Sequence, residues 1–96
     1  MEKYLVNVTW INNTKNTVET NNQIYQEKEE AHNAYYGWVI NVLKHYKMLG
    51  YPCDQTFLID NDDQKIVKYN VLEVCTYNED LNENLEITIS ASKITA

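Results

Sequence analysis

Residues 27–49 read EKEEAHNAYYGWVINVLKHYKML, and this stretch decides the fold. Apolar residues recur in it three and four positions apart, which is the spacing of a helix that lays one stripe on a core. Acidic residues in the first turn complement the helix dipole, and Gly50 followed by Pro52 predicts the end of the helix. The stripe expected to face the core consists of Ala31, Ala34, Tyr35, Trp38, Val39, Val42, Tyr46 and Leu49.

The opposite face of this helix also carries apolar residues. At about 100° per residue, Tyr36, Ile40 and Leu43 fall where a helix packed on one side should be polar. Scattered exposure explains them about as well as a partner surface does, because much of any protein surface is apolar. If a partner or a second copy of the chain binds, we expect contact here, since tyrosine is enriched among interface anchors.

Strands are predicted on both sides of the helix. Residues 4–11 alternate apolar and polar positions, 12–16 form a polar turn, and 17–25 return as a more polar strand suited to a sheet edge. After the helix we expect a short strand over 56–60, a turn at 61–64, a long strand over 65–77, an acidic loop to residue 84, and a last strand over 85–92. The apolar phase slips from Val67, Tyr69 and Val71 to Leu72 and Val74, which predicts a β-bulge near Asn70.

This order of elements predicts an α+β fold with a β-β-α-β-β-β arrangement. We expect residues 1–96 to form one domain, with a single antiparallel sheet of about five strands and the long helix on one face. The helix start and the turn at 61–64 should then lie at the same end of the sheet. That end would gather Glu27, Glu29, Glu30, Asp60, Asp62 and Asp63. The predicted core contains Trp10, Tyr35, Trp38, Val42, Phe57, Ile59, Ile87 and Ile89.

The charge balance bears on possible partners. The chain has 14 acidic residues against 8 basic ones, all of them lysine, for a net charge of −6. An acidic surface without arginine disfavours direct binding of nucleic acid. Solubility alone explains this acidity most simply, and attraction to a basic protein partner is the sharper interpretation.

Location and source are expectations from composition. No apolar segment follows Met1 and no run is long enough to span a membrane, so we expect a cytoplasmic protein with free thiols at Cys53 and Cys75. The many Asn, Lys, Tyr and Ile residues are typical of AT-rich codons, which indicates a low-GC bacterium or a phage or plasmid within one.

Motifs for catalysis, cofactors and metals are missing from the sequence. Residues 60–63 resemble the start of a calcium loop, but Lys65 stands where the loop needs glycine, and Val71 stands where it needs glutamate. His32 and His45 lack helical zinc spacing, and two glycines cannot build a phosphate-binding loop. Cys53 could approach His45, although a structural thiol is much commoner than a reactive one. We therefore expect no enzyme activity, no cofactor and no metal.

Three functions remain. The first is a non-enzymatic protein that binds and masks a basic macromolecular partner, as inhibitors, immunity proteins and nucleic-acid mimics do. The second is an accessory module that self-associates, for example as a homodimer, through the helix flank or an edge strand. The third is a small-ligand-binding domain with a pocket between Trp38, Tyr46 and the sheet, which ranks last because no converging polar groups are apparent there.

Overall fold

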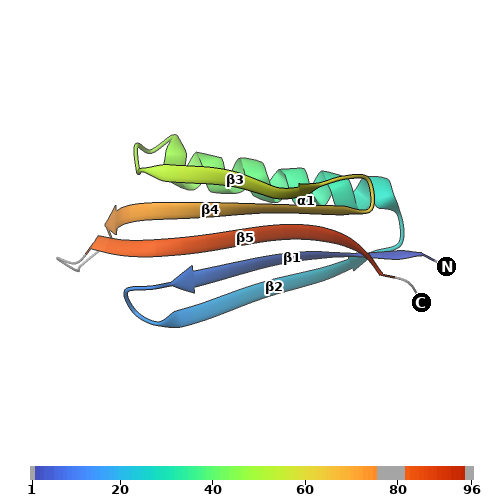
Figure 1. Ribbon diagram of the computed structural model, residues 1–96, viewed down its shortest axis with the longest axis horizontal. Coiled ribbons are helices and arrows are strands. Elements are labelled where there is room, and N and C mark those ends of the chain that lie inside the picture. Colours follow the sequence, from blue (N-terminus) through green and yellow to red (C-terminus); the bar gives the residue numbers. More distant parts are fainter. Residues whose placement is uncertain (1, 76–81, 95–96) are drawn as a thin grey trace.

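The computed structural model describes residues 2–75 and 82–94 and confirms the predicted α+β fold (Figure 1). The five strands form one antiparallel sheet, and along the chain the helical segment comes between the second strand and the third. The elements are β1 (Lys3–Asn12), β2 (Thr17–Tyr25), α1 (Lys28–Val42), a π-helical turn η1 (Leu43–Lys47), β3 (Cys53–Asp60), β4 (Gln64–Cys75) and β5 (Asn82–Ile94).

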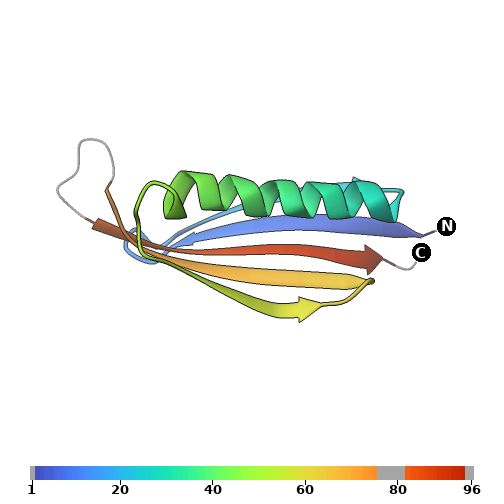
Figure 2. The ribbon, with the colours of Figure 1, turned by 90° about the horizontal axis from the view of Figure 1, so that it is seen from above.

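The strand order across the sheet is β2-β1-β5-β4-β3. Two hairpins, β1 with β2 and β3 with β4, therefore stand on either side of β5, which pairs with β1 and with β4. The helix lies along one face of the sheet, packed against β1 and β5 and more lightly against β2 (Figure 2). The edge strands β2 and β3 are consequently less covered than the centre.

The core lies between α1 and the centre of the sheet. Alternate residues of β1, β4 and β5 point at the helix, as period-two patterning requires. The open face is small and polar at its centre, and it also carries the apolar pairs Leu5 with Ile24, Ile11 with Val18 and Ile59 with Ile66. The core consists of Tyr4, Val6, Val8, Ala31, Tyr35, Val39, Val42, Val67, Tyr69, Val71, Ile87, Ile89 and Ala91. The open face carries Asn7, Thr9, Thr88, Ser90 and Ser92 in register across β1 and β5.

A bulge in β4 explains the slip in its apolar phase. Val71 pairs with Leu85 while Val74 pairs with Glu83, so β4 holds one extra residue between these pairs. The predicted bulge is confirmed, slightly beyond Asn70. It returns Val74 to the helix-covered face, where this side chain packs against the core. The predicted loop after Tyr77 falls largely on residues 76–81, outside the described residues, and β5 already begins at Asn82.

The predicted strand over 56–60 is present and begins earlier, at Cys53, but the predicted burial of Phe57 and Ile59 is wrong. A second bulge explains Ile59. Phe57 pairs with Val67, but the next pair is Ile59 with Ile66, so Ile59 turns to the open face. Phe57 does face the helix side, yet it is 55% exposed because α1 packs over β1 and β5 and leaves this edge strand uncovered. Neither residue belongs to the buried core.

The end of the helix also departs from the predicted stripe. In η1 the amide of Met48 donates to the carbonyl of Leu43, five residues back, and widens the last turn. The helical segment ends at Lys47, and Gly50 closes the turn with a φ of 94°. Leu49 is therefore 69% exposed instead of buried. Leu43, predicted on the far face, is half-buried and packs against the core.

Candidate binding site

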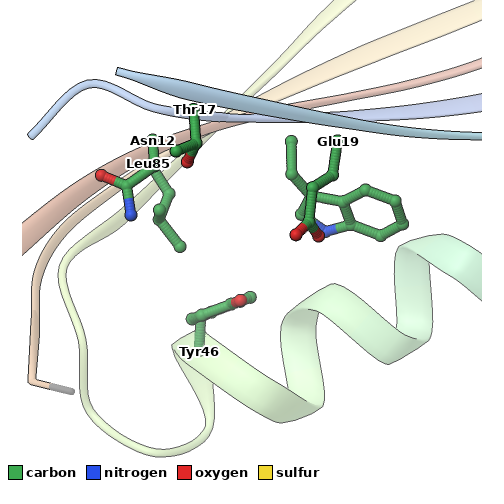
Figure 3. A pocket seen from close by; sticks show the side chains of 6 residues that line it. Asn12, Thr17, Glu19, Tyr46 and Leu85 are labelled. Carbon is green, nitrogen blue, oxygen red and sulfur yellow. The ribbon is translucent and has the colours of Figure 1, made fainter. Parts of the chain in front are cut away.

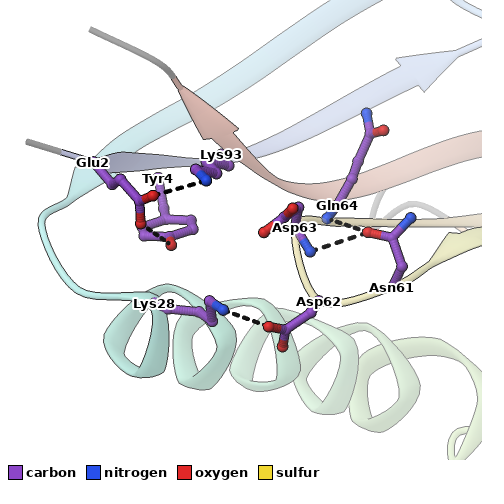
Figure 4. A network of polar contacts seen from close by, with 8 residues as sticks. All are labelled: Glu2, Tyr4, Lys28, Asn61, Asp62, Asp63, Gln64 and Lys93. Atoms are coloured by element: carbon purple, nitrogen blue, oxygen red, sulfur yellow. Dashed lines mark hydrogen bonds and ion pairs between the residues drawn. The ribbon is translucent and has the colours of Figure 1, made fainter.

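The helix start meets the turn between β3 and β4, as predicted. Lys28, in the first turn of α1, forms an ion pair with Asp62 (Figure 4). At the same end Asn61 accepts hydrogen bonds from the backbone N–H groups of Asp63 and Gln64, at 3.0 and 2.8 Å, and so holds the turn. The sheet end thus brings the predicted acidic residues together.

Lysines neutralise part of this acidic end. Lys65 lies 2.8 Å from Asp60, and Lys93 lies 2.8 Å from Glu2, which also accepts a hydrogen bond from the Tyr4 hydroxyl. The hydrogen bond and charge of Lys28 lower the pKa of Asp62, and Lys93 acts in the same way on the pKa of Glu2. Asp60 and Asp62 are therefore engaged within the chain.

The uncompensated acidity lies mainly at the helix start. Glu27 at the N-cap and Glu29 and Glu30 in the first turn are exposed, and Asp63 is exposed in the neighbouring turn. Within residues 2–75 and 82–94, these carboxylates have no ion-pair partner. We call Glu27, Glu29 and Glu30 the acidic helix start.

Exposed apolar side chains lie on the helix flank that faces β4 and β3. Tyr36 is 46% exposed and Ile40 is 52% exposed. The Lys65 ammonium of β4 sits 5.7 Å from the Tyr36 ring centroid, which fixes the direction of this flank. Phe57 of β3 adds to it from the helix-covered side of the sheet. We call Tyr36, Ile40 and Phe57 the apolar flank. Leu43 does not belong to it because that side chain packs inward.

On the other side of the helix, a pocket of about 280 Å³ opens between η1 and the ends of β1, β2 and β5 (Figure 3). The sequence predicted a pocket between Trp38, Tyr46 and the sheet without converging polar groups, and the observed pocket includes Tyr46 but not Trp38. The predicted lack of polar groups is wrong, since a carboxylate, an amide and a hydroxyl line it together with apolar side chains. The lining residues are Trp10, Asn12, Thr17, Glu19, Tyr46 and Leu85.

The strand register builds the upper wall of this pocket. Glu19 pairs with Trp10 and Thr17 pairs with Asn12 across β1 and β2, so all four side chains point to the helix side. The signal was present in the sequence, because Thr17 and Glu19 hold alternate positions of a strand. Using it required knowing that β2 pairs with β1 in this register, beside the end of the helix.

Aromatic side chains form the rest of the wall. The Trp10 ring meets the Trp38 ring edge to face, with centroids 5.5 Å apart, and this contact holds Trp10 in place. Tyr46 projects from η1 toward the strands, with one ring face toward Leu85 and Glu19 (Figure 3). Burial raises the pKa of Tyr46, and the nearby Tyr51 adds to this, so the phenol is neutral at pH 7.

A buried carboxylate lies beyond the pocket, next to the β1–β2 turn. Glu83 is 4% exposed, and its oxygens lie 2.9 Å from the Asn12 amide nitrogen and 2.9 Å from the Lys15 ammonium. The Asn12 amide oxygen accepts the backbone N–H groups of Thr14 and Lys15. Asn12 and Lys15 are therefore committed to holding the turn against β5.

Cys53 and His45 are the residues that the sequence analysis considered for catalysis. Burial raises the pKa of the Cys53 thiol, and the His45 Nδ1 bonds the Asn41 carbonyl at 2.8 Å. Among the described residues, no group of three or more His, Cys, Asp or Glu side chains is placed to hold a metal ion. In the same part of the chain, no helix is both long and apolar enough to cross a membrane.

Comparison of the chain with protein-family models, with curated proteins and with solved structures gave no match.

Proposed function

We propose that this chain is a non-enzymatic binding protein that occupies a basic surface on a protein partner and thereby masks or inhibits it. The supporting observation is the uncompensated negative charge at the acidic helix start. Three exposed glutamates stand there on one rigid turn, next to the exposed Asp63. Distributed charge of this kind speeds association with a partner of opposite sign.

Ion pairing within the fold supports the same proposal. Most lysines of the described chain hold a carboxylate of their own, so little positive charge is left to repel a basic partner. The lysines in ion pairs are Lys15, Lys28, Lys65, Lys68 and Lys93. The described carboxylates without such a pair are Glu19, Glu27, Glu29, Glu30, Asp54 and Asp63.

The apolar flank supplies the contact area that charge alone lacks. Tyr36 and Ile40 are held on a helix, and rigid aromatic and aliphatic anchors carry much of the binding energy in protein interfaces. We therefore assign different roles to the two parts of the surface with which this protein would contact its partner. The acidic helix start steers the encounter, and the apolar flank slows dissociation.

The test begins with a partner captured from a lysate of the source organism and identified by mass spectrometry. Replacing Glu27, Glu29 and Glu30 by glutamine should slow association with this partner and flatten its dependence on salt. A matched control, Asp54→Lys with Thr20→Lys, raises the net charge by the same amount at exposed strand positions. Tyr36→Ser with Ile40→Ser should instead speed dissociation. If neither variant changes the kinetics relative to the control, the proposal is wrong.

Self-association is a second candidate, favoured by the exposure of the apolar flank. A second copy could cover Tyr36, Ile40 and Phe57, and the function would then belong to the assembly. Sedimentation over a range of concentrations separates the two. A dimer that dissociates in Tyr36→Ser with Ile40→Ser, but persists in Val18→Ser with Ile24→Ser, supports self-association. The control pair removes similarly exposed apolar side chains from β2.

A further inference from the structure

We propose that the pocket between η1, β1 and β2 binds an organic cation, an alkylammonium or guanidinium group, through the Glu19 carboxylate and the rings of Trp10 and Tyr46. This inference does not depend on the acidic helix start or on the proposed function.

The charge of the lining supports a cation. Glu19 contributes the one carboxylate among the lining residues, and it has no ion pair within the described part of the chain. Figure 3 shows this carboxylate directed from β2 toward the helix side, into the space above Tyr46. A ligand that carries a positive charge would complete the ion pair that the fold leaves open there.

The aromatic walls support the same ligand class. Trp and Tyr rings attract cations through their negative faces, and this attraction grows where water is partly excluded. Trp10 from β1 and Tyr46 from η1 are both half-buried, and both line the pocket. Leu85 adds an apolar surface suited to the hydrocarbon stem of a lysine or arginine side chain.

The remaining polar groups of the pocket also suit a ligand that donates hydrogen bonds. The Thr17 and Tyr46 hydroxyls make no hydrogen bond to another described residue, and each can accept one from an ammonium or guanidinium N–H. The Lys15 ammonium does not occupy this role, because it is placed 2.9 Å from Glu83. An anionic ligand would meet the unpaired Glu19 carboxylate and is disfavoured.

The wall of the pocket on β1 and β2 is formed before a ligand binds. Trp10 is held by its edge-to-face contact with Trp38, and the strand register places the backbone of Glu19 beside that of Trp10. The Trp10 ring is therefore ordered before a ligand binds, which lowers the entropy cost of binding against this wall.

The experiment uses the full chain and follows its backbone amide and indole signals by nuclear magnetic resonance during titration. The probe is Nα-acetyl-arginine amide, and its uncharged counterpart is Nα-acetyl-citrulline amide. The arginine probe should shift the Trp10 indole signal and the amides of Glu19 and Tyr46, and the citrulline probe should bind at least about threefold more weakly. Equal affinity for the two probes, or no shift at these residues, would overturn the inference.

Variants separate the pocket from the overall charge. Glu19→Gln should weaken the arginine probe by about three- to fivefold, whereas Asp54→Asn, which removes the same charge from β3, should leave its affinity unchanged. Tyr46→Phe keeps the ring and loses only the hydroxyl, so it should weaken binding less than Tyr46→Leu, which removes the ring and should weaken binding by about two- to fivefold. Equal losses in Glu19→Gln and Asp54→Asn would mean that only net charge matters, and the inference would fail.

A peptide distinguishes the source of the cation. A pentapeptide with one arginine between glycines is titrated beside the amino-acid amide. Tighter binding of the peptide supports a side chain of a protein partner, and equal binding supports a free amine or guanidine compound. The titration reports on residues of the pocket, whereas the variants of the acidic helix start report on association with the captured partner. Either experiment can therefore support its own proposal when the other one fails.

Discussion

Single residues that the sequence pattern treats alike have very different environments in the fold. Ile89 is fully buried at the centre of the sheet, and Phe57 is 55% exposed on the edge strand β3. Ile89→Ala should lower the free energy of unfolding by about 2–5 kcal/mol, because it removes buried area and leaves a cavity. Phe57→Ala should cost less than about 1 kcal/mol. Urea unfolding followed by circular dichroism measures both, and equal losses would contradict the burial described here.

Of the eight side chains that the sequence predicted in the core, four are buried and Trp10 and Trp38 are half-buried against it. The prediction failed where position across the sheet matters. Tyr35, Val42, Ile87 and Ile89 were expected inside and are buried. Their alternation or helical spacing is enough to identify them. Phe57 satisfied the same pattern, but its burial depends on how far the helix reaches across the sheet. No local pattern in the sequence encodes that reach.

At the scale of elements, the two glycines provide a matched test. Gly37 lies within α1 with open space where a Cβ would be, whereas Gly50 has a φ of 94° after η1. Gly37→Ala should stabilise the protein by about 0.5–1 kcal/mol, since alanine loses less backbone entropy in a helix. Gly50→Ala should destabilise it by about 1 kcal/mol, because a side chain disfavours the left-handed region. Thermal melts of the two variants should shift in opposite directions.

The same elements show how far local rules extend. The boundaries of β2, residues 17–25, agree with the prediction. Turn residues mark the beginning of this strand, and the start of the helix marks its end. The widened turn η1 was not predicted, since a π-helical turn depends on a hydrogen bond to one residue further back than usual. The pocket was only half predicted for a similar reason. Tyr46 could be placed by helical spacing, but Glu19 joins it only through the pairing of β2 with β1.

For the whole molecule, exposed ion pairs should make stability depend on pH. The pKa values of Glu2, Asp62 and Glu86 are each lowered in the folded state, from 4.5, 3.8 and 4.5, by hydrogen bonds from lysines. A carboxylate with a lowered folded pKa stabilises the fold above its unfolded pKa and loses this effect as the pH falls through the folded pKa. The urea midpoint should therefore hold near neutral pH and decline below about pH 4.5.

Two controls belong to that titration. Lys28→Met removes the partner of Asp62 and should make the acid decline shallower, because the Asp62 pKa then returns toward its ordinary value. About 1 M NaCl should have a similar effect on all three pairs, since these groups are exposed and screened by salt. A steeper decline in Lys28→Met would contradict the sign of the Asp62 shift.

The central place of β5 in the sheet has a consequence for the time course of folding. This strand pairs with β1 from Lys3 opposite Ile94 to Asn12 opposite Leu85, and it also pairs with β4. It is nevertheless the last of the strands to leave the ribosome. Until then the nascent chain holds two separate hairpins with unpaired inner edges, which invite pairing with other chains. Such long-range closure slows folding, so the sheet should be completed only after β5 has emerged.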